Sequence, residues 1–318
     1  MPSADPDPNA PGRQATHPSR FPTAAWAQVL GRVWNGISRD HLSVVAAGVA
    51  FFAMLSVFPT IGALIALYGY VSDPAEIASV LHTLRPLLPG DVYAMLADQV
   101  SQLIAAPQSS LGLASLVSLV LAIWFARAGV AGLMEGLNVV YREVDDRSIV
   151  VQYLIAVGLT LLLVLVAVAA LVAVVAVPAL LHFTEIGALG ALLAQVVPLL
   201  ILGVAMVFVI GLLYRYGPRR AAARARWITV GAVVATVGWV LASLALSFYV
   251  GRFGNFNETY GSIGAIVGLM FWLYASAFVV LIGAELNAAM ELQTERDTTT
   301  GPPRPMGERG AYVADHVA

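Results

Sequence analysis

The sequence predicts an all-α membrane protein, a polytopic helix bundle with six transmembrane helices. Only 11% of its 318 residues are charged and 59% are hydrophobic, whereas soluble domains carry roughly 25% charged residues. A chain with so few charges cannot cover its own surface in water. Six segments also contain the run of about 20 apolar residues that a membrane crossing requires.

The two ends of the chain are the most polar parts of the sequence. Residues 1–22 contain six prolines, and such a segment cannot bury enough apolar surface to fold. We expect a disordered cytoplasmic tail there, and a second one over residues 293–318. The six-span membrane domain then covers residues 23–292.

An amphipathic helix is predicted over residues 23–40, directly before the first span. Its apolar residues recur at helical spacing, namely Trp26, Val29, Leu30, Val33, Trp34 and Ile37. Two interpretations fit this stripe. The helix lies along the inner membrane surface, or it docks on the helix bundle.

The six predicted spans cover about residues 43–71, 111–134, 149–180, 189–214, 227–250 and 262–287. The first and third are too long for one straight crossing. Each has a proline near its far end, Pro59 and Pro178, so we expect a kink or a protruding turn.

Between the first two spans, the segment from Asp73 to Pro107 predicts two short extracytoplasmic helices with an apolar stripe each. Burying large apolar side chains is favourable by about 1.5–3 kcal/mol each. We therefore expect these helices to form a cap on the outer face of the bundle.

The arginines predict the orientation. Fourteen of them lie in the N-terminal region, the second and fourth connections and the C-terminal tail, whereas Arg85 and Arg252 lie in the opposite loops. Basic residues stay on the cytoplasmic side. Both termini are therefore expected in the cytoplasm.

No catalytic, metal-binding or cofactor-binding constellation is predicted. The chain has no cysteine, which excludes disulfides and thiolate metal sites, and it has no lysine for Schiff-base chemistry. Its five histidines are scattered, and no carboxylates converge as a metal-dependent nuclease requires. With a net charge of −2, we expect neither an enzyme nor a nucleic-acid partner.

Polar residues inside two spans are the candidates for function. On the second span, Arg127, Glu135 and Asn138 share one helix face within about 80°. On the last span, Glu285 follows 22 uncharged residues and lies roughly 4 Å past the apolar slab. We hypothesise that Glu285 pairs with Arg127, with Asn138 and Asn287 nearby. The alternative is that both charges reach the headgroup zone separately.

Small residues and an outer loop complete the candidate set. Glycines at four-residue spacing let helices approach closely, and the expected packing positions are Gly132, Gly136, Gly261, Gly264, Gly268 and Gly283. The loop before the last span offers polar groups at the outer mouth, namely Asn255, Asn257, Glu258 and Tyr260. This loop is interpreted as ordered, with a ligand contact as the alternative.

Three motifs, "VAAGVAFFAMLSVFPT", "GLNVVYR" and "YGSIGAIVGLMFWLYASAFVVLIGAELNA", together with the six-span layout, resemble the YihY/BrkB family of bacterial inner-membrane proteins. The likeness covers about residues 25–292. Family members were once labelled ribonuclease BN, and for most no substrate is established. The resemblance marks the following motif positions without giving any of them a role: Pro59, Asn138, Tyr260, Gly261, Gly264, Gly283, Glu285 and Asn287.

Two functions of different classes remain open. The first is a transporter, or a protein that translocates lipids or solutes, with an unknown small-molecule or lipid substrate. The second is a non-transporting envelope protein that organises partners or lipids. Membrane lipids surround the protein in both cases, and fold resemblance alone does not decide between them. The sequence indicates no oligomeric state.

Overall fold

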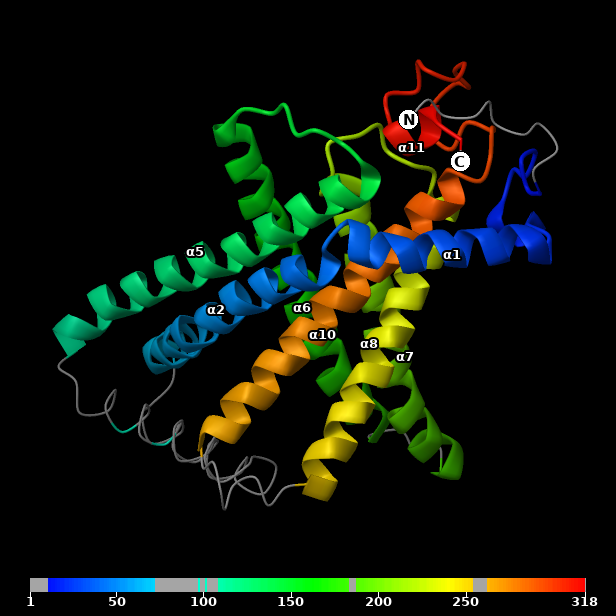
Figure 1. Cartoon of the computed structure of the whole chain (residues 1–318). Coiled ribbons are helices and arrows are strands. Elements are labelled where there is room, and N and C mark those ends of the chain that lie inside the picture. The colour runs from blue at the N-terminus through cyan, green and yellow to red at the C-terminus, as the bar shows by residue number, and fades with distance from the viewer. Residues whose placement is uncertain are drawn as a thin grey trace. The chain divides into compact units, whose positions relative to one another are not determined.

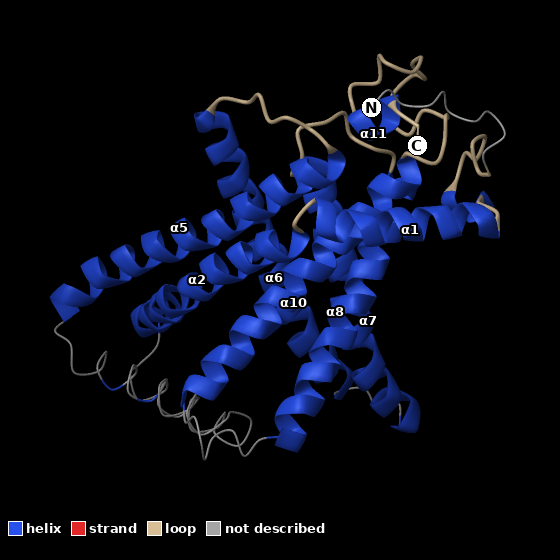
Figure 2. Cartoon of the chain, viewed as in Figure 1, coloured by secondary structure: helices blue, strands red, loops and turns tan. Residues whose placement is uncertain are grey.

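The structure is a computed structural model that describes residues 11–71, 97, 101, 108–182, 187–253 and 262–317. The named elements of these ranges are helices (Figure 2). The described residues contain one isolated β-bridge, between Ala223 and Thr299. The predicted cap over Asp73–Pro107 and the outer-mouth residues Asn255, Asn257, Glu258 and Tyr260 lie outside the described residues, as does Gly261.

In the described parts of the chain, six helices are long and apolar enough to cross a membrane, which confirms the six predicted spans. They are α2 (Leu42–Val71), α5 (Gln108–Tyr141), α6 (Ile149–His182), α7 (Gly187–Tyr216), α8 (Ala225–Phe253) and α10 (Ser262–Glu291). Pro59 lies inside α2 and Pro198 inside α7. Shorter helices are η1 (Pro18–Arg20), α1 (Thr23–Arg39) and α11 (Tyr312–Asp315).

The long helices present apolar side chains outward. Leu165 and Val168 of α6 and Leu199 and Val204 of α7 are each more than half exposed. Helices α6 and α7 pack against each other, so these residues occupy the remaining sides of the pair. In water such surfaces drive aggregation, but in a membrane they contact lipid.

The chain divides into two compact units. The first contains Met1–Ala47, Val130–Ala242 and Ala275–Ala318, and the second contains Gly48–Gly129 and Ser243–Tyr274. In the second unit, α2 and α5 approach closely, because a side chain at Gly129 would contact the backbone of Val49 and Ala53. There, too, the Trp272 indole donates a hydrogen bond to Ser243 Oγ at 2.9 Å.

Within the first unit, one end of the helices is covered by a structure that we call the terminal layer. It consists of α1 with the preceding residues 11–22, the connections 142–148 and 217–224, and the C-terminal residues 292–317. Figure 1 shows α1 crossing α10 near the end where α10 leads into the C-terminal residues.

Helix α1 docks on the bundle by one edge of its apolar stripe. Val29 and Val33 are buried in a cluster with Leu286 and Met290 of α10. The other edge stays open, with Trp34 77% exposed and Leu30 58% exposed. The docking interpretation is therefore confirmed for one edge, and contact of the other edge with the membrane surface stays a prediction.

The described parts of the two chain ends contact each other, and the disorder expected at residues 1–22 and 293–318 stays a prediction. Each end supplies the hydrogen-bond partners of the other. Thr294 donates to the carbonyls of Arg13 and Ala15 at 3.1 and 2.8 Å. The Arg309 guanidinium donates to three carbonyls, and Val313 is fully buried. The contacts between the two ends are absent from any local sequence pattern.

A close helix crossing joins α8 to α10 at two glycines. A methyl group on Gly231 would overlap the Gly283 carbonyl oxygen, and one on Gly283 would lie 2.5 Å from the Gly231 carbonyl oxygen. Gly136 also lies in a close contact, since a methyl there would lie 2.7 Å from Val45 Cγ1. Around Gly268, by contrast, there is nothing within 4 Å.

We expect Gly231→Ala to destabilise the folded protein, because the added methyl forces α8 and α10 apart. Overpacking of this kind costs about 1–3 kcal/mol. Gly211→Ala is the matched control, because Gly211 lies in α7 with nothing within 4 Å and alanine favours a helix. Thermal unfolding of the detergent-purified protein measures both. Equal melting temperatures for the two variants would contradict the close crossing.

Candidate functional site

Glu285, in the last two turns of α10, lies beneath α1. It is 3% exposed, and its Oε1 lies 3.4 Å from Nη2 of Arg39 at the end of α1. The same guanidinium binds the adjacent Asp40 through Nε at 2.8 Å and Nη2 at 2.7 Å. One arginine therefore serves two carboxylates. The hydrogen bond to Asp40 raises the pKa of Arg39 above its usual value, so Arg39 stays charged.

A glycine makes room for the Glu285 carboxylate. A side chain at Gly36 of α1 would overlap both Oε1 and Cδ of Glu285, so α1 can pass over this acid only because position 36 lacks a Cβ. The second oxygen, Oε2, is buried and accepts no hydrogen bond from the described residues. An acid held this way is poorly solvated, and its contact with α1 compensates its burial only in part.

The partner expected for Glu285 was Arg127. Arg127 belongs to the second unit, where its guanidinium lies 5.6 Å from the Trp124 ring. The pairing of Arg127 with Glu285 therefore stays a prediction. Arg39 was missed because it lies off the apolar stripe of α1, and nothing in the local sequence indicates which span this helix crosses.

Asn287 joins α10 to α8. Its Oδ1 accepts a hydrogen bond from the Gly231 backbone N–H at 2.9 Å, and its Nδ2 donates to the Ile228 carbonyl at 3.3 Å. The side chain is completely buried, so this amide has both its donor and its acceptor partner inside the bundle. Nearby, the Tyr214 hydroxyl donates to the Val280 carbonyl at 2.6 Å, which adds α7 to the same junction.

Asn138 connects two loops of the terminal layer. Its Oδ1 accepts from the Arg219 backbone N–H at 2.8 Å, and its Nδ2 donates to Asp145 at 3.3 Å. Asp145 forms an ion pair with Arg147, and this hydrogen-bonded partner holds the pKa of Asp145 below its usual value. Glu135, which was expected on the same polar face, is exposed.

A second buried acid, Glu291, ends α10. It binds Arg220 in a bidentate ion pair at 2.9 and 2.7 Å, and both side chains are almost completely buried. Thr298 donates to Glu291 at 2.6 Å, and the Tyr141 ring lies 4.7 Å from the guanidinium. Burial alone lowers the pKa of Arg220, but the Glu291 carboxylate raises it above the usual value.

Neither Glu291 nor Arg220 was predicted from the sequence as a functional residue. Both lie at span ends, where charged residues are common, and their pairing depends on a loop that folds back toward α10. The described residues contain no group of three or more histidine, aspartate or glutamate side chains placed to hold a metal ion. The buried polar groups described above thus act as contacts between helices and the terminal layer.

The chain is similar to several known proteins, among them membrane proteins. A family model described as virulence factor BrkB matches residues 33–307. A Bacillus subtilis protein named putative ribonuclease-like protein YfkH is 30% identical over 254 residues, which are 77% of this chain and 88% of that protein. A UPF0761 membrane protein of Tolumonas auensis is 28% identical over 286 residues, 85% of this chain and 88% of that protein. No solved structure matches.

We expect Gly36→Ala to loosen α1 from α10, because the methyl group occupies the space of the Glu285 carboxylate. The cost is about 1–3 kcal/mol, as for other overpacked sites. Gly31→Ala is the control on the same helix, since nothing lies within 4 Å of Gly31. Thermal unfolding in detergent compares the two.

Glu285→Ala should reduce the damage of Gly36→Ala, because it removes the group with which the new methyl collides. A double variant as unstable as the sum of both changes would mean that these residues do not share one space.

Proposed function

The chain belongs to the BrkB virulence-factor family of membrane proteins, and on that premise we propose that it translocates a small solute or a lipid. The membrane that it serves is the bacterial inner membrane. The alternative is a non-transporting envelope protein that organises lipids or partner proteins.

The observation that carries the proposal is the buried Glu285 carboxylate beneath α1. An ionisable side chain within a span is costly and therefore points to function by default. Here two carboxylates share the single Arg39 guanidinium. If α1 lifts from α10, water can solvate both acids, which offsets the contact that is lost. Because solvation offsets the lost contact, the closed and open positions of α1 are close in free energy. This suits a gate that opens and closes.

The arginine distribution supports a cytoplasmic position for this contact. Arg219, Arg220 and Arg224 lie in the connection between α7 and α8, within the same layer as residues 11–22 and 292–317. Under the positive-inside rule, the terminal layer lies in the cytoplasm and α1 acts as an inner gate. Glu285 and Arg39 then form the latch of that gate.

We also propose that the chain is not a ribonuclease and binds no nucleic acid. The ribonuclease-like description belongs to the Bacillus subtilis relative. In the present sequence no acidic or histidine residues follow a metal-ligand spacing, and the net charge is −2. Its partners are instead membrane lipids and the translocated molecule.

Reconstituted liposomes test translocation. The full chain is inserted into vesicles of bacterial lipid extract that carry a fluorescent phospholipid and a trapped mixture of small metabolites. Dithionite quenching reports lipid movement, and mass spectrometry of the medium reports solute release. We expect at least one of the two to exceed the rate in protein-free vesicles.

Glu285→Gln should slow that movement by about tenfold, which corresponds to about 1.4 kcal/mol, because the latch loses its charge while keeping its size. Asp146→Asn is the control, since Asp146 is an exposed acid of the same unit. If the parent protein moves neither lipid nor solute faster than empty vesicles, the non-transporting alternative holds.

A further inference from the structure

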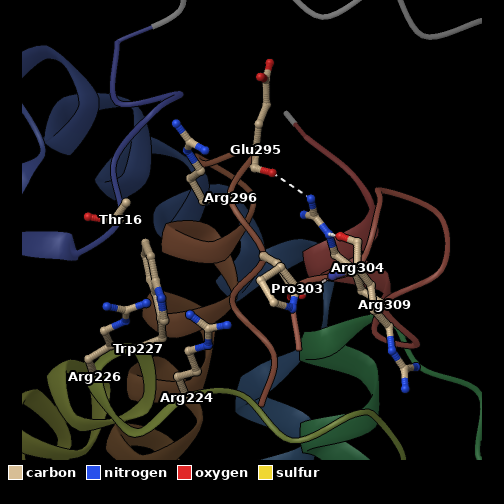
Figure 3. A pocket seen from close by; sticks show the side chains of 10 residues that line it. Thr16, Arg224, Arg226, Trp227, Glu295, Arg296, Pro303, Arg304 and Arg309 are labelled. Carbon is tan, nitrogen blue, oxygen red and sulfur yellow. Dashed lines mark hydrogen bonds between the residues drawn. The ribbon is translucent and has the colours of Figure 1, made fainter. Parts of the chain in front are cut away.

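A pocket of about 300 Å³ lies in the terminal layer, away from Glu285. It is formed by the start of α8, the N-terminal Thr16 and the C-terminal residues (Figure 3). Its lining is dominated by cationic side chains, namely Arg224, Arg226, Arg296, Arg304 and Arg309. The acidic residues in the lining are Glu295 and Asp297, which leaves the pocket with an excess of positive charge.

Both acids are already engaged elsewhere. Glu295 forms an ion pair with Arg13 at 3.3 Å and accepts a hydrogen bond from Gln14 at 3.2 Å. Asp297 accepts from the backbone and hydroxyl of Thr299 and from the Arg304 backbone N–H. Although burial raises the pKa of Asp297, these hydrogen bonds hold it below its usual value. Through these contacts the two carboxylates hold the surrounding segments of the chain in place around the pocket.

The arginines fall into two groups. Arg309 donates to three backbone carbonyls, and Arg224 donates through Nε to the Thr299 carbonyl at 2.8 Å. The side chains of Arg226, Arg296 and Arg304 have neither a carboxylate within 4.0 Å nor a hydrogen-bond acceptor among the described residues. No pair within the described part of the layer neutralises these cations.

Trp227 adds an unused donor to the same wall. The residue is 1% exposed, and its Nε1–H has no acceptor among the described residues. A buried donor without a partner is costly. Figure 3 shows Arg224 and Arg226 on either side of the Trp227 ring, so a ligand there can meet both cations and the indole.

We propose that this pocket binds an anion that carries a phosphate group. Guanidinium groups bind phosphate through paired, charge-assisted hydrogen bonds, and a phosphate oxygen can also accept from the Trp227 indole. The volume is at the lower limit of ordinary ligand sites, which fits a phosphate with a small substituent. This site is separate from the Glu285 latch and does not depend on the transport proposal.

The phosphate can come from a lipid headgroup or from a soluble compound. Arg226 and Trp227 are among the first residues of α8, where the span Ala225–Phe248 begins, so headgroups lie within reach. The pocket also belongs to the terminal layer, so a soluble compound can reach it from water. The two sources share the same chemistry and differ in the probe that detects them.

Binding is measured on the detergent-purified full chain at constant ionic strength, by calorimetry. One titration uses sodium pyrophosphate, and the other uses short-chain dioctanoyl phosphatidylglycerol, with dioctanoyl phosphatidylcholine as its zwitterionic reference. We expect saturable binding of pyrophosphate, of phosphatidylglycerol, or of both in competition. Preference for phosphatidylglycerol identifies a headgroup site, and preference for pyrophosphate identifies a soluble ligand.

Arg224→Gln combined with Arg226→Gln should weaken binding by at least about tenfold. Arg219→Gln is the control, because Arg219 lies outside the pocket in an exposed pair with Asp146, and it should leave affinity within about twofold. Arg296→Gln with Arg304→Gln provides a second pair whose side chains make no contacts that folding needs. Absence of binding for both probes, or equal affinity in the parent, both pairs and the control, would overturn the site.

Discussion

The end of α10 is the constraint on which the first unit depends. Three polar side chains in its last two turns each reach a different element, Glu285 toward α1, Asn287 toward α8 and Glu291 toward the 217–224 connection. Asn287 and Glu291 are four residues apart and share a helix face, whereas Glu285 points to another side. Because each is buried, removing its partner leaves an unsatisfied polar group, which costs more than the contact itself contributes.

This arrangement gives the two ends of the chain a defined place. Arg220 and Thr298 both bind Glu291, so the connection and the C-terminal residues meet at one carboxylate. Arg13 and Thr294 then bring the N-terminal residues to the same region. The resulting layer holds a buried acid beneath α1 and, separately, a pocket with unneutralised arginines. A latch and an anion site can thus coexist in one folded layer without sharing residues.

The spans could be predicted because hydropathy depends on composition alone, and each apolar run became a helix. The importance of Asn138, Asn287 and Gly283 was also visible, since polar or small residues in a span need a nearby partner. What the sequence could not indicate was the identity of those partners. Arg39, Arg220 and Gly36 look ordinary locally, and they matter only because distant segments cross there. The contacts between residues 11–22 and the C-terminal residues could not be predicted either, because the composition of each end says nothing about its partner.

Hydrogen exchange of Glu291→Gln tests most directly whether the end of α10 holds the terminal layer. The variant leaves Arg220 buried opposite a neutral group, at a cost of about 3–5 kcal/mol. Exchange should therefore accelerate by about a hundredfold or more in residues 217–224 and 292–317, with α6 and α7 unchanged. Asp146→Asn, which disrupts an exposed pair, should change neither region. Unchanged protection in the layer, or a uniform loss across all helices, would contradict the account.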